Sequence, residues 1–468
     1  MSAAVSRAWG KRSFYIRGVV LGSSLEPDSV AREDCIMTHQ ERRLIVAGTL
    51  LIGVSYGLAR FAYGLFLPSM REDVGMGSTM AGAIGSGAYV GYCFAIVISA
   101  LLVERLGARA IAVAAALVAA TGMAVISVST SAPWLAGAIL LAGASTGLAS
   151  PPMAQAVSSS IATDRQGRAN TVINAGTSLG VAISGPVAFI ATGQWRIAYA
   201  AFAVAALLNA VLLFVSVPRA GTSEARDDTA SKAAGRPNRE GVRRASAWRV
   251  MVAAMGMGIA SAAYWTFSSE ALLTQGEFSQ ALANSVWILI GVAGLVGGLA
   301  GDLVNRFGIN GVHRATLLAL ALALSLLALM PSSLPAALGS GALFGASYIM
   351  LTGIYLVWGV RLYSDRPAIG LGLPFLMIAA GQIVGSPLAG YLIGNHGYAF
   401  CFIVFASIAL ATMPIGYRSA RGAQADAAPK ATVSSRPGVP LQHFYLPAMP
   451  PLGLIDKIGR LARRGSGR

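Results

Sequence analysis

The sequence predicts an all-α polytopic membrane protein with 12 transmembrane helices in two pseudo-symmetric six-helix bundles. Three observations carry this prediction. First, 55% of the 468 residues are hydrophobic and only 12% are charged, whereas a soluble domain has about 25% charged residues. Second, residues 110–163 and 315–360 contain no charged residue, and each stretch is long enough for two spans of about 20 residues. Third, sequence landmarks recur at one fixed spacing.

Apolar runs of helical length follow one another along the chain, and none alternates as the strands of a membrane barrel must. The predicted helices are 44–69, 78–103, 110–129, 133–159, 169–192, 197–217, 248–273, 282–303, 314–330, 334–362, 368–394 and 398–417. The predicted organisation is a disordered tail at 1–42, bundles at 43–217 and 248–417, a linker at 218–247 and a tail at 418–468. The linker and the basic, Pro-rich final tail are predicted to be flexible and cytoplasmic. Met37 begins a segment typical of a natural start.

The two bundles look like copies of one unit, because separate landmarks share an offset of 201 residues. The recurring pairs are ERLG at 104–107 with NRFG at 305–308, Asp164-Arg165 with Asp365-Arg366, Gly180 with Gly381, and Pro186 with Pro387. Parallel repeats of this kind place a substrate site at their interface, near the middle of the bilayer.

The net charge of +16 does not indicate a nucleic-acid partner, because the basic residues lie in the tails and in short gaps between apolar runs. With the N-terminus in the cytoplasm, the inner short loops hold Arg105, Arg109, Arg165, Arg168, Arg306, Arg314, Arg361 and Arg366. The outer loops then hold only Arg71 and Arg196. This asymmetry predicts that both termini are cytoplasmic.

The loop after the second helix, ALLVERLGAR at 100–109, resembles a motif of the major facilitator superfamily that runs Gly, three residues, Asp, Arg, one residue, Gly, Arg. Arg105 and Gly107 match it, whereas Ala100 replaces the glycine, Glu104 the aspartate, and Arg109 stands one position late. The second copy, GDLVNRFG at 301–308, keeps Gly301, Arg306 and Gly308 of the pattern and has Asn305 at the aspartate position. The fifth helix, NAGTSLGVAISGP, resembles the Gly-Pro motif of the superfamily's exporters, and ARFAYGLFLP resembles the first helix of its YbfB/YjiJ-type branch, which is often found in bacteria.

The resemblance spans about residues 43–417 and implies the major facilitator fold, a 12-helix secondary transporter of a small molecule in the plasma (inner) membrane. It does not name a cargo. It also implies a gate that latches the two halves when the carrier faces outward. The expected gating residues are Glu104, Arg105, Gly107, Arg109, Asn305, Arg306 and Gly308. The alternative is that these arginines only fix the topology.

Arg60 stands inside the first apolar helix. At 100° per residue it shares a face with Gly53, Gly57 and Gly64, and with two tyrosines, whereas the face of Val54 and Leu58 is predicted to meet lipid. An arginine at depth costs about 2.5–3.5 kcal/mol. Three explanations stay open: a substrate or coupling role, structural pairing with Glu270 or backbone carbonyls, and snorkelling to the outer surface.

Other polar and aromatic side chains of the helices are candidates for the pathway, although each alone is as well explained by packing. The candidate substrate and coupling residues are Arg60, Tyr56, Tyr63, Gln155, Asn174, Tyr264, Trp265, Glu270, Tyr355 and Gln382. If transport is coupled to protons, Glu270 is the first candidate for the titrating group and Asp302 the second. The four histidines are placed in tails or loop ends.

The sequence contains no zinc-ligand, P-loop or dinucleotide-binding pattern, so no cofactor, metal or enzymatic activity is expected. The prediction is a secondary transporter that works by alternating access, with protons as the expected coupling ion. The Gly-Pro motif favours efflux, and the expected cargo is an organic anion or amphiphilic compound. The alternative is a non-transporting membrane sensor or scaffold on a transporter fold.

Overall fold

The computed structural model describes residues 38–191, 193–219, 240–363 and 367–417, and the statements below concern these residues. The predicted tails, apart from residues 38–42, and the middle of the predicted linker lie outside them. The described elements are helical: α2 (His39–Ile52), η1 (Gly53–Phe61), α3 (Ala62–Val74), α4 (Ser78–Ser127), α5 (Ala132–Ser160), α6 (Thr163–Ile190), α7 (Trp195–Ser216), α8 (Glu240–Thr274), α9 (Gln280–Gly294), η3 (Leu295–Leu299), α10 (Ala300–Leu329), α11 (Leu334–Leu362) and α12 (Pro367–Thr412).

Within the described residues, nine helices are long and apolar enough to cross a membrane. Three of them, Ser78–Ser127, Gln280–Leu329 and Gly372–Thr412, have 50, 50 and 41 residues, about twice the roughly 20 residues that one crossing needs. Each contains one glycine with non-helical backbone angles, at Gly107, Gly308 and Gly397. Three double-length helices and six single ones are consistent with the twelve predicted crossings.

The 201-residue repeat is visible in the backbone. Gly107 has φ 79° and ψ 160°, and Gly308, 201 positions later, has φ 74° and ψ 158°. A glycine tolerates this positive φ because it has no Cβ. The halves also share a helix crossing: a Cβ on Gly57 would collide with the backbone of Gly180, and a Cβ on Gly381 would lie 3.0 Å from Cα of Gly258. Both partners recur at the same offset, which confirms two pseudo-symmetric bundles.

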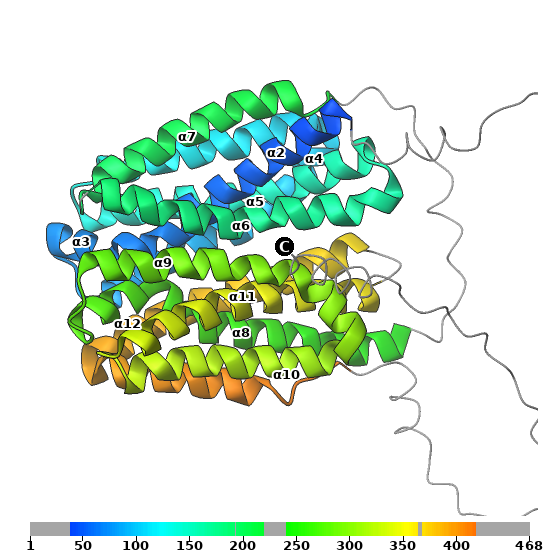
Figure 1. Ribbon diagram of the computed structural model, residues 1–468. Helices are drawn as coiled ribbons and strands as arrows, with labels where there is room; N and C mark the ends of the chain where they lie inside the picture. The colour runs from blue at the N-terminus through cyan, green and yellow to red at the C-terminus, as the bar shows by residue number, and fades with distance from the viewer. Residues whose placement is uncertain (1–37, 192, 220–239, 364–366, 418–468) are drawn as a thin grey trace, which may run out of the picture. The chain divides into compact units, whose positions relative to one another are not determined.

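The helices of the first half, α2 to α7, and those of the second half, α8 to α12, form two groups in Figure 1. We call the end of the bundle that holds residues 38 and 417 the terminal end, and the opposite end, with the loops at 75–77 and 275–279, the far end. Close backbone contacts join the halves at the far end, and α6 also packs along α9 and η3 between the halves. A Cβ on Gly82 of α4 would collide with Ser386 of α12, and one on Gly64 of α3 with Trp265 of α8.

The first crossing is built from α2, η1 and α3, and its stretch from Leu51 to Leu67 is enclosed by other helices. Its start is fixed by a capping box in which Thr38 and Glu41 satisfy each other's backbone amides. The prediction that one of its faces meets lipid is wrong: Val54, Leu58 and Leu65 are 7%, 5% and 1% exposed. A helical segment that is apolar on all sides is buried on all sides, and here α6 packs against Gly53 and Gly57 while α8 packs against Gly64. Nearer the terminal end, α2 keeps Val46 and Leu50 exposed.

Candidate functional site

Arg60 lies in a π-helical segment, Gly53–Phe61, in the middle of the first crossing. Such i→i+5 segments are rare and are frequent at functional sites. Gly53 and Gly57 on this segment sit against α6, where a Cβ on Gly53 would lie 3.1 Å from the Gly176 carbonyl oxygen. This glycine contact fixes the segment in the bundle with the arginine turned to the interior, as predicted.

The guanidinium of Arg60 is held by aromatic rings and one amide. It lies 4.3 Å from the ring centre of Tyr89, 5.0 Å from Tyr92, 5.1 Å from Phe61 and 5.6 Å from Tyr56. We call these four rings the aromatic cage. The side chain is 6% exposed, so it does not snorkel to a surface. Four cation–π contacts at about 0.5–2 kcal/mol each offset the cost of an arginine at depth without any carboxylate.

The amide that reaches Arg60 comes from the other half of the protein. Arg60 Nη2 donates to Gln382 Oε1 at 2.8 Å, and Gln382 Nε2 donates to the Tyr348 hydroxyl at 3.3 Å. Beside this bond, Phe61 stacks on Trp265 with ring centres 4.0 Å apart. Arg60 Nε has no hydrogen-bond partner among the described residues. A charged group with an unused donor therefore sits between the two halves.

The structure pairs Glu270 with Arg71, so the pairing of Arg60 with Glu270, one of the three explanations left open for Arg60, is not formed in this conformation. Arg71 Nη1 of α3 binds Glu270 Oε1 of α8, and the two side chains are 20% and 8% exposed. Arg71 Nε also donates to the Met76 carbonyl at 3.1 Å. The pair crosses between the halves at the far end. Asp302, the second candidate for a titrating group, is exposed near the start of α10.

The remaining candidates divide into cage neighbours and packing residues. Tyr56 of the cage exchanges a hydrogen bond with Ser150 at 2.9 Å. Tyr63 donates to the Ala81 carbonyl at 2.8 Å, which ties the first crossing to α4. Tyr264 is fully buried, stacks on Phe344 and bonds to Ser340. Gln155 has a buried Oε1 without a described partner, and Asn174 is exposed.

The structure does not join the predicted gating residues across the halves. Glu104, Arg105 and Arg306 are exposed and form no ion pair within the described part of the chain. Arg361 donates to Asn305 Oδ1 at 3.1 Å inside the second half. Gly107 and Gly308 form the two kinks described above. Among the described residues no ion pair engages a latch at the terminal end, and its role stays a prediction.

Arg109 is the gating candidate that the structure places elsewhere. Its Nε donates to the Val217 carbonyl at 2.6 Å, and its guanidinium lies 5.5 Å from the Phe214 ring centre. Both partners belong to the end of α7 and its continuation in the same half. Arg109 therefore ties two helices of one bundle together and does not bridge the bundles here.

Two groups of contacts in the structure have no clear signal in the sequence. Tyr89 and Tyr92 lie on α4 three residues apart. In the sequence alone, two aromatic residues at this spacing look the same whether they form a cage or pack in a core. His313 was placed at a loop end, but it is fully buried in α10, and its Nε2 lies 3.1 Å from the Tyr355 hydroxyl. Tyr355 in turn donates to the Ala253 carbonyl at 3.1 Å. This chain of contacts makes Tyr355 a packing residue of the second half.

Solved transporters share this architecture. One is the nucleoside transporter NupG (D323A mutant), with 14% identity, a TM-score of 0.63 and coverage of 80% of this chain and 99% of that one. Another is a POT family transporter in complex with 5-aminolevulinic acid, with 14% identity, a TM-score of 0.64 and coverage of 80% and 94%. A third is the xylose transporter XylE from E. coli, with 16% identity, a TM-score of 0.62 and coverage of 81% and 97%. At these identities the likeness shows the fold.

No curated protein matches the sequence closely enough to count as a relative. The family model described as Major Facilitator Superfamily matches residues 49–373, well over half of the chain. With its apolar helices and its transporter-like fold, the chain is an integral membrane protein and belongs to the major facilitator superfamily.

Proposed function

We propose that this protein is a secondary transporter that moves a small organic anion, or an amphiphile with an anionic or carbonyl-rich group, by alternating access. The single observation that carries the proposal is Arg60, a buried charge without a carboxylate partner among the described residues, placed where the two halves meet. Its cage of rings provides an apolar wall, and its guanidinium provides donors in a fixed fork that suits carboxylate or phosphate groups.

The position of Arg60 couples binding to rocking of the halves. The arginine belongs to the first half and its amide partner Gln382 to the second. An anion that displaces Gln382 from Nη2 replaces a neutral acceptor by a charged one, and such hydrogen bonds are roughly twice as strong. Binding would therefore change the contact between the halves at the same atom that recognises the cargo, which is the requirement of an alternating-access carrier.

We infer that the carrier is closed at the far end in this conformation, because contacts between the halves are close there. The arginine asymmetry of the short loops favours a cytoplasmic location for the terminal end and both termini. On this orientation the protein faces inward, and the Arg71–Glu270 pair holds the outer end closed. Protonation of Glu270 would break the pair, which makes this carboxylate the proposed site of proton coupling. The resemblance of α6 to the Gly-Pro motif of the superfamily's exporters favours efflux.

Transport by the purified protein in proteoliposomes tests the proposal. The vesicles are loaded with a panel of labelled organic anions, matched neutral analogues and cations, and a pH gradient is applied in either direction. Specific movement of at least one anion, absent from protein-free vesicles, is expected.

A membrane sensor or scaffold on the same fold would move none of these compounds. If no member of the panel moves while the protein still binds one of them and changes shape, the transporter assignment fails in favour of a sensor.

A further inference from the structure

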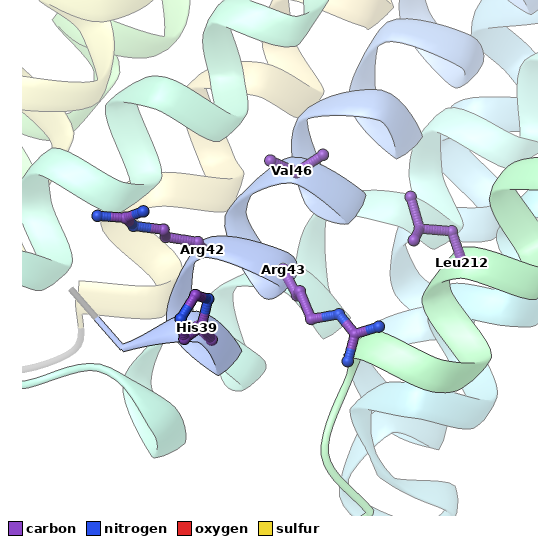
Figure 2. Close-up of a pocket in the computed structure, with 5 residues that line it drawn as sticks. All are labelled: His39, Arg42, Arg43, Val46 and Leu212. Carbon is purple, nitrogen blue, oxygen red and sulfur yellow. The ribbon is translucent and has the colours of Figure 1, made fainter.

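Two adjoining pockets lie at the terminal end of the first half, away from Arg60. The first has a volume of about 410 Å³ and is lined by His39, Arg42, Arg43, Val46 and Leu212 (Figure 2). The second has a volume of about 290 Å³, and Arg109 is among the residues that line it. His39 and Arg43 line both pockets, because a four-residue spacing puts them on one face of α2. In Figure 2 the Arg43 side chain points toward the end of α7.

The pseudo-symmetry of the fold shows which part of Arg109 is structural. Asn310, 201 positions later, makes the equivalent tie in the second half: its Nδ2 donates to the Tyr417 carbonyl at 2.9 Å, and its Oδ1 accepts from the Tyr417 amide at 2.6 Å. Each residue follows a glycine kink and holds the chain that leaves the last helix of its half. An uncharged amide performs this task in the second half. The positive charge of Arg109 is therefore not needed for the tie.

The pockets place the positive charge of Arg109 beside apolar walls. Val46 is 53% exposed and Val215 is 56% exposed on the membrane-spanning helices α2 and α7. No carboxylate lines either pocket. Glu41, the nearby acid of α2, is 7% exposed and is engaged with Thr38 and with Arg165 at 3.3 Å. A ligand that fits has an anionic head and an apolar body that follows the helices into the bilayer.

We propose that His39, Arg43 and Arg109 bind the phosphate headgroup of an anionic phospholipid whose acyl chains lie along Val46, Leu212 and Val215. Basic pockets between transmembrane helices are suited to such headgroups, at about 1 kcal/mol per arginine near the surface. Free phosphate shares the headgroup chemistry but cannot use the apolar walls. The proposal rests on the protein being embedded in a membrane and is independent of its cargo.

Native mass spectrometry of the purified full chain, titrated with phosphatidylglycerol or phosphatidylcholine, measures the binding. The test variant combines Arg43→Gln with Arg109→Asn. The asparagine at position 109 keeps an amide that can bond the chain after α7, as Asn310 bonds the Tyr417 backbone in the second half. Its affinity for phosphatidylglycerol should fall about 30-fold, the equivalent of about 2 kcal/mol. The matched control is Arg168→Gln, an exposed arginine of α6 that lines neither pocket, and its affinity should stay at the level of the unmodified protein.

Thermal melting of the same samples separates loss of the site from loss of the fold. Arg43 makes no hydrogen bond within the described residues, so Arg43→Gln alone should leave the Tm unchanged and weaken binding about 5-fold. Equal affinity of the double variant and the control would overturn the proposal. So would equal binding of phosphatidylcholine, or stabilisation by inorganic phosphate as strong as that by the lipid. Because none of these readouts involves transport, failure here leaves the proposed function untouched.

Discussion

Glu270→Gln removes the carboxylate that joins the two halves at the far end, and it should shift the protein toward a conformation open at that end. The contribution of the Arg71–Glu270 pair to the closed conformation should lie between that of an exposed pair and that of a buried pair, because Arg71 is 20% and Glu270 is 8% exposed. Exposed ion pairs contribute about 0–1 kcal/mol, and removing one partner of a fully buried pair costs about 3–5 kcal/mol. We expect about 2 kcal/mol, a shift of about 30-fold in the ratio of closed to open molecules.

Spin-label distances across the far end measure this shift. Labels on cysteines at positions 72 and 275, both exposed, report the separation of α3 and α8 after the three native cysteines are replaced by alanine. The fraction of the long distance should rise in Glu270→Gln. Asp73→Asn is the matched control: Asp73 lies two positions from Arg71 on the same helix but pairs with Arg196 of its own half. Its distance distribution should match that of the unmodified protein.

The charge-swapped pair Arg71→Glu with Glu270→Arg should restore the closed distance, because the attraction between the halves returns. If Glu270→Gln folds and keeps the distances of the unmodified protein, the Arg71–Glu270 pair does not hold the far end closed.

Three further predictions concern packing, the gate and topology. Gly57→Ala should cost about 1–3 kcal/mol and lower the Tm, because its Cβ would collide with Gly180, whereas Gly137→Ala, with open space around it, should not; equal melting of both variants would refute the tight crossing. Arg105→Ala should insert normally but slow transport, and unchanged transport at equal expression would leave Arg105 a topology signal. A reporter enzyme that works only outside the cytoplasm should be inactive when fused within 220–239, and activity there would reverse the orientation.

The sequence was sufficient for the architecture because membrane spans and repeats leave strong signals. Long uncharged runs require helices, since the bilayer offers backbone groups no other partner. The shared offset of ERLG and NRFG pointed to a duplication, and the matching backbone angles of Gly107 and Gly308 confirm it. The inward direction of Arg60 was also predictable, because glycines mark the face along which helices approach closely.

The partners of the charged residues were not predictable, because they depend on which helices become neighbours. Arg60 meets two tyrosines of α4 and an amide of α12, none of which carries the opposite charge that a sequence search favours. Arg71 was counted only as an outer-loop arginine, although it binds Glu270. The spacing of charges along the chain does not encode a contact between residues separated by almost half its length.

If Arg60 binds the anionic part of a transported molecule, its variants should lose transport in proteoliposomes. The unmodified protein, Arg60→Lys and Arg60→Ala are reconstituted in equal amounts, and uptake or efflux of the best anionic member of the panel is measured. Arg60→Ala should abolish transport while the protein still inserts. Arg60→Lys should weaken it, because an ammonium cannot reproduce the planar fork of a guanidinium. Full transport of the anion by Arg60→Ala would contradict the account.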